Sequence, residues 1–354
     1  MKKPFLRQLI SGSTPPGRTE FHAFLDRVMS NDIGKSEVVA FLSGLSGRPL
    51  CPENVDNFVS YYFQVTPAKY LDGAEGAVNI VGTGGGSIST FNISTAAAFV
   101  ASAAGAKVLK SGSAAYSSQC GSLDVLDALA VPMPTSESQL TDMVGKFGLG
   151  FIPASHYGLL LKQLIVKALP LPFRDIAGFV NTIGPLLCPY QVSGQLIGVG
   201  RLEHMEVFSE VFARRKPPKT LLVHADCGMD EFCSIGVNYS RLISEDMQRF
   251  SISSRDFGFG GGSLANLSGG TIPENTEILR EVLAGRRHGE PRDTVVLNSA
   301  ALLFLAGVAL SIEDGIRLAA LTIDDGKAIR QLDRVVEWGS RLASNKRSVA
   351  AIEE

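Results

Sequence analysis

The strongest constraint on this sequence is a glycine-rich loop that stands between an apolar strand and an alanine-rich helix. Residues 78–81 form a short apolar run typical of a buried strand, and residues 96–105 form a helical stretch that ends in glycine. Between them lies GTGGGSISTFNIST, residues 82–95. Glycines let a backbone adopt positive φ and bring amides close to a ligand, and a helix start offers free N–H groups to an anion. The segment therefore predicts a phosphate-binding loop.

The density of glycines and hydroxyls separates this loop from an ordinary turn. A tight turn with a helix cap needs one or two glycines, whereas this loop has four glycines in five positions, followed by Ser, Thr and Asn side chains at the helix start. Its spacing matches neither GxGxxG nor GxxxxGK[ST]. The pattern therefore disfavours a dinucleotide or a P-loop nucleotide as the ligand.

Strands and helices alternate along the chain after this loop, which predicts an α/β fold. Further strands are expected at residues 106–110, 195–200 and 220–225. Residues 1–72 show helical periodicity without strand alternation, so we expect a small helical N-terminal lobe, joined by part of 156–185. The larger lobe, residues 73–354, is expected to contain a central, mostly parallel sheet flanked by helices.

Composition restricts the partners and the compartment. The chain has 33 Lys and Arg against 35 Asp and Glu and no basic run, so nucleic acid is not an expected partner. Five scattered cysteines are typical of reduced thiols in the cytoplasm, and Cys227 and Cys233 lack the further ligands that would complete a metal site. We recognise no signal peptide, and the longest apolar run, residues 300–310, is too short for a bilayer, so no membrane association is expected.

Two adjacent carboxylates, Asp230 and Glu231, follow a predicted strand and a glycine-containing loop. Adjacent carboxylates suit a hard cation such as Mg²⁺, which prefers oxygen ligands. A solvated acidic pair at a strand end is the alternative, and the pair taken alone favours that alternative.

Several segments together resemble the anthranilate phosphoribosyltransferase family. The pattern GTGG, four residues, then TFNIST resembles that family's signature. Further resemblances follow in the same order, in KSGSAAYSSQCGSLDVLDAL (110–129), NTIGPLLCP (181–189), HADCGMDE (224–231), GGTIPENTEILREVLAG (269–285) and DTVVLNSAALLFLAG (293–307). The resemblance covers nearly the whole chain.

The resemblance implies an activity, a cofactor and a set of binding residues. The implied reaction transfers phosphoribosyl from phosphoribosyl pyrophosphate to an aromatic amine, anthranilate or an analogue, and releases pyrophosphate, as in tryptophan biosynthesis. Mg²⁺ is expected on Asp230 and Glu231 with Ser94, and a homodimer through the helical lobe. No covalent catalytic residue is expected, because positioning and electrostatics suffice. Residues implied to bind phosphoribosyl pyrophosphate are Gly82, Thr83, Gly84, Gly85, Gly86, Ser87, Thr90, Asn92, Ile93, Ser94, Thr95, Lys110, Gly112, Ser117, Ser118 and Ser122.

The departures from the family cluster where the acceptor would bind. The family's His-Gly-Asn-Arg is here Ser111-Gly112-Ser113-Ala114, and the acidic residue expected after GTGG is Gly86. The family's arginine segment for the anthranilate carboxylate is missing. Arg174 either takes over that task from a shifted position or pairs with its neighbour Asp175. His156 either approaches the acceptor or is a packed core residue. The acceptor contacts we expect are Ser111, Ser113, Arg174 and His156.

Three other functions remain open on the sequence. In the first, the acceptor is a different aromatic or heterocyclic compound of a specialised pathway. In the second, the protein is a pyrimidine-type nucleoside phosphorylase. This hypothesis is suggested by residues 174–186, which resemble the base-binding stretch of those enzymes, whereas TFNIST and the Asp-Glu pair argue against it. The third is a non-catalytic binding homologue, which loss of the acceptor residues allows and retention of the metal-site residues opposes.

Overall fold

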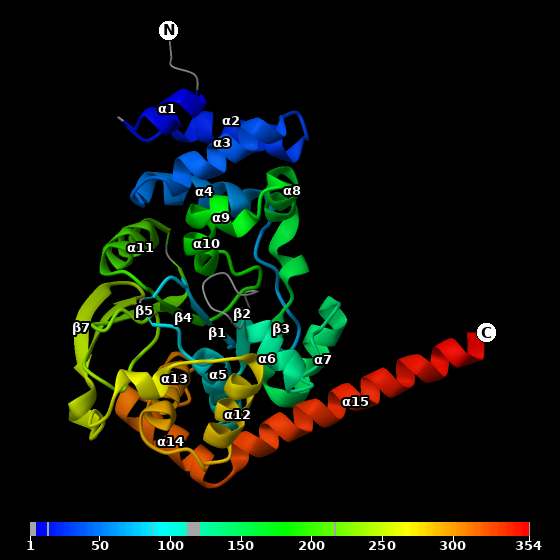
Figure 1. The fold of residues 1–354 in the computed structure, drawn as a ribbon, viewed down its shortest axis with the longest axis vertical. Helices are drawn as coiled ribbons and strands as arrows, with labels where there is room; N and C mark the ends of the chain where they lie inside the picture. The colour runs from blue at the N-terminus through cyan, green and yellow to red at the C-terminus, as the bar shows by residue number, and fades with distance from the viewer. Residues whose placement is uncertain (1–4, 13, 87, 112–120, 216, 354) are drawn as a thin grey trace.

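The structure, a computed structural model, describes residues 5–12, 14–86, 88–111, 121–215 and 217–353, with side chains described up to residue 342. An all-helical lobe stands above a larger lobe that contains a sheet and further helices (Figure 1). The fold is therefore mixed α/β, as the alternation of strands and helices predicts. No helix among the described residues has both the length and the apolar character required to cross a bilayer.

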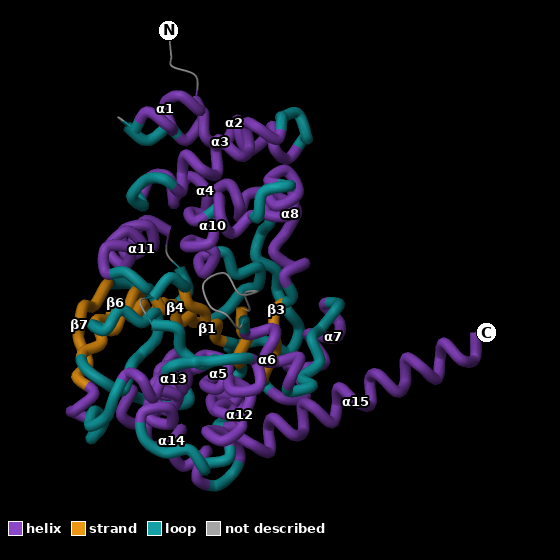
Figure 2. Tube along the Cα trace, in the orientation of Figure 1, coloured by secondary structure: helices purple, strands orange, loops and turns teal. Residues whose placement is uncertain are grey.

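A seven-stranded sheet forms the middle of the larger lobe (Figure 2). Its strands are β1 (Val78–Gly82), β2 (Val108–Ser111), β3 (Leu149–Ile152), β4 (Gly194–Gly198), β5 (Lys219–Ala225), β6 (Val237–Ile243) and β7 (Met247–Ser253). The strand order is β3-β2-β1-β4-β5-β6-β7, parallel from β3 to β5 and antiparallel from β5 to β7. The mostly parallel sheet that we predicted is thus confirmed.

Both faces of the parallel part are buried, which explains why its strands are nearly continuous apolar runs. Val78, Ile80 and Leu221 belong to the core beneath the sheet, and Ile197 and Leu222 to the core above it. The helices associated with the lower core are α5 (Ile93–Ala103), α6 (Ser122–Ala128), α7 (Glu137–Phe147), α12 (Ile272–Leu283), α13 (Glu290–Leu305), α14 (Ile312–Asp324) and α15 (Lys327–Glu353). The far end of α15 projects away from the body (Figure 1).

The helical lobe is assembled from two separate parts of the chain. The first part comprises α1 (Phe5–Ser11), α2 (Arg18–Met29), α3 (Lys35–Ser46) and α4 (Pro52–Val65), and the second comprises α8 (Gly158–Ala168), α9 (Phe173–Ile176) and α10 (Gly178–Ile183). The two parts share one core with α11 (Leu202–Arg215). Lys167 Nζ donates to Ile33 O at 3.0 Å, and Ser46 Oγ to Ile176 O at 2.9 Å, so polar contacts also join them. The exact boundary at residue 72 stays a prediction.

Strand order decides where a ligand is expected. The connection through α5 carries the chain from β1 to β2 on one side, whereas β4 lies on the other side of β1. Ligands of open α/β sheets bind outside the carboxyl ends of the strands at such a reversal. The glycine-rich loop begins at that end of β1, so the fold places the predicted phosphate-binding loop at the switch point of the sheet.

Candidate functional site

Three described segments meet at the carboxyl ends of the parallel strands. They are the glycine loop after β1, the Gly198–Gly200 corner after β4, and residues 226–236 after β5, which we call the acidic loop. Thr83 N donates to Gly198 O at 2.9 Å, and Gly200 N donates to Thr83 Oγ1 at 3.0 Å. These bonds hold the glycine loop against the end of β4.

Glycine is required here by both conformation and close approach. Gly84 and Gly85 have φ of 68° and 72°, in the left-handed region that side chains disfavour. A Cβ on Gly86 would lie 2.8 Å from Gly228 O, and a Cβ on Gly198 would overlap the backbone carbonyl of Asp230. The acidic loop is therefore in backbone contact with the glycine loop at Gly86 and with the end of β4 at Gly198, and a side chain at either glycine would disturb that contact.

The two carboxylates predicted to bind a cation lie directly on the predicted phosphate-binding elements. Asp230 Oδ2 accepts a hydrogen bond from Gly84 N at 2.7 Å. Glu231 Oε1 accepts one from Ser94 N at 3.0 Å, in the first turn of α5, and the Ser94 hydroxyl also bonds this carboxylate. Glycine loop, helix start and acidic pair therefore converge on one place, although they are about 140 positions apart in the chain.

Burial gives these charged groups unusual proton affinities. Loss of water, reinforced by the neighbouring charge of Asp230, raises the pKa of Glu231 to about 8, and burial also raises the pKa of Asp230. Lys110 is buried too, and burial lowers its pKa to about 8 while both carboxylates oppose that shift. Its Nζ donates to Ser111 O at 3.3 Å. The cluster thus holds two carboxyl groups and one amine whose charged forms are all disfavoured by burial.

The start of α5 offers further polar atoms. Among the described residues, Asn92 Oδ1 and Thr95 Oγ1 are buried without a hydrogen-bond partner, which is costly unless a ligand or water supplies one. Thr90 forms a bridge to Ser268, which holds the residues before the helix in place. The Ile93 side chain belongs to the core, so only its backbone can face a ligand.

Three residues predicted to contact the acceptor are described, and each has a partner within the protein. Ser111 Oγ accepts from Asn79 Nδ2 at 2.9 Å and also hydrogen-bonds Tyr157. His156 Nδ1 is 2.6 Å from the Tyr190 hydroxyl, which places it within the protein's own network. Arg174 forms the local ion pair that was its alternative, with Nε 3.4 Å from Asp175 Oδ1 and a side chain that is 61% exposed.

Several predicted site residues lie outside the described residues. These are Ser87, Gly112, Ser113, Ser117 and Ser118. Ser122 is described and begins α6, where Gly121 N donates to Asp124 Oδ2 at 2.8 Å in a capping box.

Sequence reasoning missed part of the site. Gly198 and Gly200 were included in a predicted strand, although two glycines at a strand end are a signal for close backbone approach. Asn79 and Tyr157, which hold Ser111, carry no such signal, because their contacts join distant segments. His224, noted only as a motif residue, donates from Nδ1 to Val199 O at 2.8 Å and braces β5 against the end of β4.

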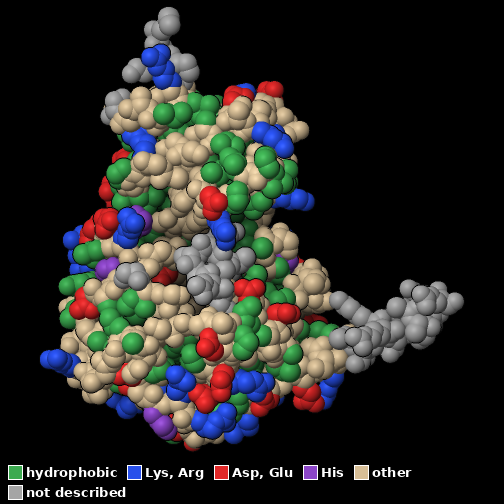
Figure 3. Space-filling model, in the orientation of Figure 1, with side chains coloured by type: hydrophobic (Ala, Val, Ile, Leu, Met, Phe, Trp, Pro, Cys, Tyr) green, Lys and Arg blue, Asp and Glu red, His purple; other side chains and the backbone are tan. Residues whose placement is uncertain are grey.

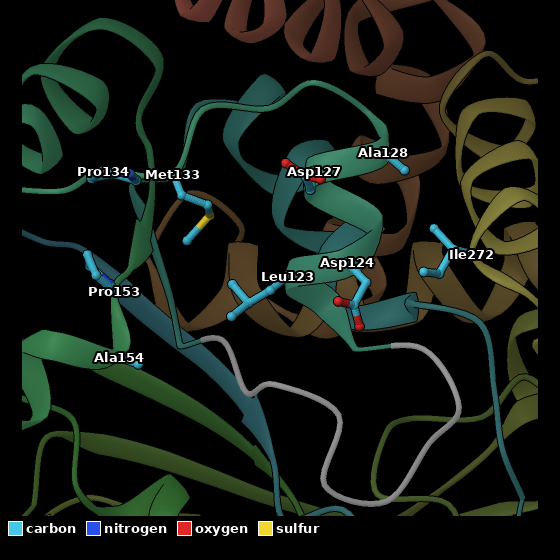
Figure 4. Close-up of a pocket in the computed structure, with 9 residues that line it drawn as sticks. All are labelled: Leu123, Asp124, Asp127, Ala128, Met133, Pro134, Pro153, Ala154 and Ile272. Atoms are coloured by element: carbon cyan, nitrogen blue, oxygen red, sulfur yellow. The ribbon is translucent and has the colours of Figure 1, made fainter. Parts of the chain in front are cut away.

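A hollow elsewhere on the larger lobe differs from this site in its lining. It is lined by Leu123, Asp124, Asp127, Ala128, Met133, Pro134, Pro153, Ala154 and Ile272 (Figure 4). Its lining is mostly apolar, and Asp124 already caps α6. None of the residues that hold the acidic pair line it.

Comparisons with known proteins agree over nearly the full length. The family described as glycosyl transferase family, a/b domain, matches residues 74–329. The anthranilate phosphoribosyltransferase of Rubrobacter xylanophilus is 34% identical over 97% of this chain and 99% of its own length. The one from Exiguobacterium sibiricum is 34% identical over 86% and 89%.

Solved structures give the same result. The anthranilate phosphoribosyltransferase of Thermus thermophilus superposes with a TM-score of 0.79 at 25% identity, covering 96% of this chain and 100% of that one. The Saccharomyces cerevisiae enzyme, solved in complex with phosphoribosyl pyrophosphate (PRPP) and Mg, has a TM-score of 0.78 at 25% identity and coverages of 95% and 97%.

Proposed function

Because the chain belongs to the anthranilate phosphoribosyltransferase family of glycosyl transferases, we propose that it transfers phosphoribosyl from phosphoribosyl pyrophosphate to anthranilate or a close aromatic amine. Pyrophosphate is the second product. The observation that carries this proposal is the convergence of Asp230 and Glu231 with the amides of Gly84 and Ser94. That arrangement provides both anion donors and cation ligands for one diphosphate.

The proposed binding of the pyrophosphate arm uses backbone more than side chains. The amides of the glycine loop and of the first turn of α5 point to the place that the carboxylates now occupy. Lys110 is the nearby cation and would bind the same phosphates. The unpartnered Asn92 Oδ1 would accept a hydrogen bond from a ribose hydroxyl. These contacts support the wider list of phosphoribosyl pyrophosphate ligands as a proposal.

The donor set fits Mg²⁺. Two half-buried carboxylates with raised pKa values, beside the Ser94 hydroxyl, form an oxygen site whose ionisation a cation would favour. Among the described residues no group of three or more His, Cys, Asp and Glu side chains is placed to hold a metal. Mg²⁺ often completes its shell with substrate phosphates and water, so Asp230, Glu231 and Ser94 are sufficient protein ligands. When bound, the cation neutralises charge on the departing pyrophosphate.

The chemical step needs no covalent intermediate. The amine nitrogen of the acceptor forms a bond to C1 of the ribose as the bond from C1 to the pyrophosphate oxygen breaks, and the nitrogen then loses a proton. The protein's contribution is to hold the two reactants in line and to stabilise the negative charge that leaves. Ser111, Ser113, His156 and Arg174 remain the proposed acceptor residues, and of these Ser111 lies at the carboxyl end of β2 beside Lys110.

Three further features are proposed together with this function. A homodimer through the helical lobe is supported by apolar side chains on α8 and the segment after it, each at least 41% exposed: Leu159, Ile165, Val166, Leu169 and Leu171.

On the face in Figure 3, basic and acidic side chains are interspersed, which supports a small-molecule substrate over a nucleic acid. Unpaired thiols at Cys51 and Cys188 support a cytoplasmic location.

The reaction itself tests the proposal. Purified protein, Mg²⁺ and phosphoribosyl pyrophosphate are incubated with anthranilate or with a panel of other aromatic amines and heterocycles, and pyrophosphate release is followed. Release with anthranilate supports the assignment, and release only with another compound moves the protein to a different acceptor. Phosphate-dependent cleavage of uridine or thymidine would identify a phosphorylase. No turnover with any compound, despite tight donor binding, would identify a non-catalytic homologue.

The acidic pair provides a matched mutational test. Asp230→Ala combined with Glu231→Ala is expected to abolish turnover, because it removes both charged cation ligands. Glu245→Ala with Asp246→Ala removes an equally adjacent acidic pair from the exposed turn between β6 and β7, and should leave the rate unchanged. If the first variant keeps the wild-type rate at limiting Mg²⁺, the metal assignment is wrong.

A further inference from the structure

Two cysteine thiols flank the acidic pair and touch each other. Cys227 lies three positions before Asp230, and Cys233 two positions after Glu231. The two thiols hydrogen-bond one another. Cys233 is fully buried, whereas Cys227 is only partly buried and can meet a small reagent. The proposed transfer reaction uses neither thiol.

The two ends of this segment differ in their hydrogen bonds and in their burial. Cys233 N donates to Asn238 Oδ1 at 2.8 Å, and its carbonyl accepts from Asn238 Nδ2 at 2.9 Å and from Ser254 Oγ at 2.8 Å. The neighbouring Phe232 N donates to Asn298 Oδ1 at 3.1 Å. At the other end, Gly228 N donates to Ala225 O at 2.8 Å, Ala225 N to Met229 O at 3.1 Å, and Asp226 N to Val237 O at 2.8 Å. Cys227 is the less buried end of the segment, so we expect a pull between the sulfur atoms to move its turn more than the Cys233 side.

The Cys227 turn is also the part of the acidic loop that touches the glycine loop. A Cβ on Gly86 would lie only 2.8 Å from Gly228 O, so the two backbones are in contact. Two residues after Gly228, Asp230 Oδ2 accepts a hydrogen bond from Gly84 N at 2.7 Å. A change in the turn would be transmitted directly to the donors proposed to bind pyrophosphate.

We propose that Cys227 and Cys233 form a reversible disulfide that closes the acidic loop and weakens the binding of pyrophosphate with Mg²⁺. The weakening rests on the proposed function, whereas the disulfide does not. Bond formation would bring the sulfur atoms from contact to about 2.05 Å. The shortening displaces the turn at Gly228 against Gly86 and reorients the carboxylates between the two cysteines.

The oxidation is a thiol–disulfide exchange with a low-molecular-weight disulfide. The Cys227 thiolate attacks one sulfur of the reagent, forms a mixed disulfide and releases one thiolate. The Cys233 thiol then loses its proton, attacks the Cys227 sulfur and releases the second thiolate. The two protein thiols lose two electrons and two protons, and the reagent is reduced to two thiols. Cys227 is the more exposed of the two thiols, which suits it as the attacking group.

The first measurement asks whether the bond forms. The full-length protein is incubated with an excess of an oxidised low-molecular-weight disulfide, digested without reduction and mapped by mass spectrometry. We expect a peptide in which Cys227 and Cys233 are linked, lighter by two hydrogen atoms and lost on treatment with dithiothreitol. A map that shows both thiols free, or linked to other cysteines, overturns the proposal.

The second measurement asks what the bond does. Binding of inorganic pyrophosphate in the presence of Mg²⁺ is measured by calorimetry on reduced and oxidised protein. We expect the oxidised form to bind about tenfold more weakly, with recovery after reduction. An oxidised protein with unchanged affinity overturns the regulatory consequence. Reduced protein that binds no pyrophosphate contradicts the proposed function, and the peptide map then still decides the disulfide.

Two substitutions separate this pair from other thiols. Cys227→Ser should bind pyrophosphate as reduced wild type does and lose all response to the oxidant. Cys51→Ser removes a partly buried cysteine in the helical lobe and should keep the full response. If Cys51→Ser abolishes the response, or Cys227→Ser retains it, the effect belongs to other cysteines and the assignment is overturned.

Discussion

The surroundings of the Glu231 carboxyl group disfavour its ionised form. Its pKa rises from an ordinary value of 4.5 to about 8 because it is buried beside Asp230. Near neutral pH it therefore keeps its proton while no cation is bound. Since a cation requires the ionised form, binding of Mg²⁺ must release that proton.

We expect the affinity for Mg²⁺ with pyrophosphate to rise between about pH 6 and about pH 8 and to level off above that. The sign follows because the free site binds more protons than the loaded site below the pKa of Glu231, so lower pH opposes loading. Calorimetry in buffers of different ionisation enthalpy measures both the affinity and the protons released. Glu231→Gln should bind weakly with a flatter pH profile. An affinity of wild type that is constant over this range contradicts the prediction.

Lys110 is the buried amine that partly balances the acidic pair. We expect Lys110→Met, which keeps the length of the side chain, to lower kcat/KM for phosphoribosyl pyrophosphate by roughly 10²-fold, since a buried cation near developing negative charge is removed. Lys107→Met is the control, because its amine is exposed and forms a surface ion pair with Glu75 at 3.5 Å. Steady-state kinetics should show that only Lys110→Met loses activity. Melting temperatures should show that both variants are folded. Equal losses in both would point to a general effect of charge.

At the scale of the elements, the contact between the end of β4 and the acidic loop depends on a missing side chain. Gly198→Ala places a methyl group against the backbone carbonyl of Asp230. We expect this to lower the free energy of unfolding by about 1–3 kcal/mol and to weaken donor binding. Gly145→Ala in α7 has nothing within 4 Å of the new methyl group and should raise the free energy of unfolding by about 0.5–1 kcal/mol. Urea denaturation measures both changes in the free energy of unfolding. A Gly198→Ala protein as stable as wild type would show that the acidic loop can shift away from β4 without cost.

The parts of the fold that sequence reasoning reached are those with local signals. β1, β2, β4 and β5 are short apolar runs buried on both faces, and each was predicted with boundaries within a few residues. β3 has four residues directly after a helix and was missed. β6 and β7 were missed as well, because half-exposed strands such as MQRFSIS owe their conformation to pairing with a neighbour rather than to apolar character.

The same distinction applies to the candidate site. The glycine loop and the acidic pair carry chemistry in their residue types, and the structure brings both together. Contacts such as Asn79 with Ser111 depend on strand register, which residue type does not encode. Residue type alone does not decide whether Arg174 and His156 face a ligand or their partners in the structure, Asp175 and Tyr190, because these contacts depend on the tertiary fold.

At the scale of the whole molecule, exposed apolar side chains gather on α8 and the segment after it. We expect Val166→Glu with Leu169→Glu to convert a dimer into a monomer, because both residues lie on that surface at about one-half exposure. Leu310→Glu alters a side chain that is 90% exposed on the larger lobe and should leave the dimer intact. Analytical ultracentrifugation distinguishes the two. A wild-type protein that sediments as a monomer removes the basis for this prediction.

The division of the helical lobe between two parts of the chain has a consequence for biosynthesis. The four N-terminal helices leave the ribosome first, but α8–α10, which complete their core, are translated only after β1–β3. At about 5–20 residues per second, Phe21, Phe41 and Phe58 would wait several seconds without their final neighbours. Nascent chains stalled before Gly158 should therefore recruit chaperones through the segment that was made earliest, and arrest beyond Ile183 should release them.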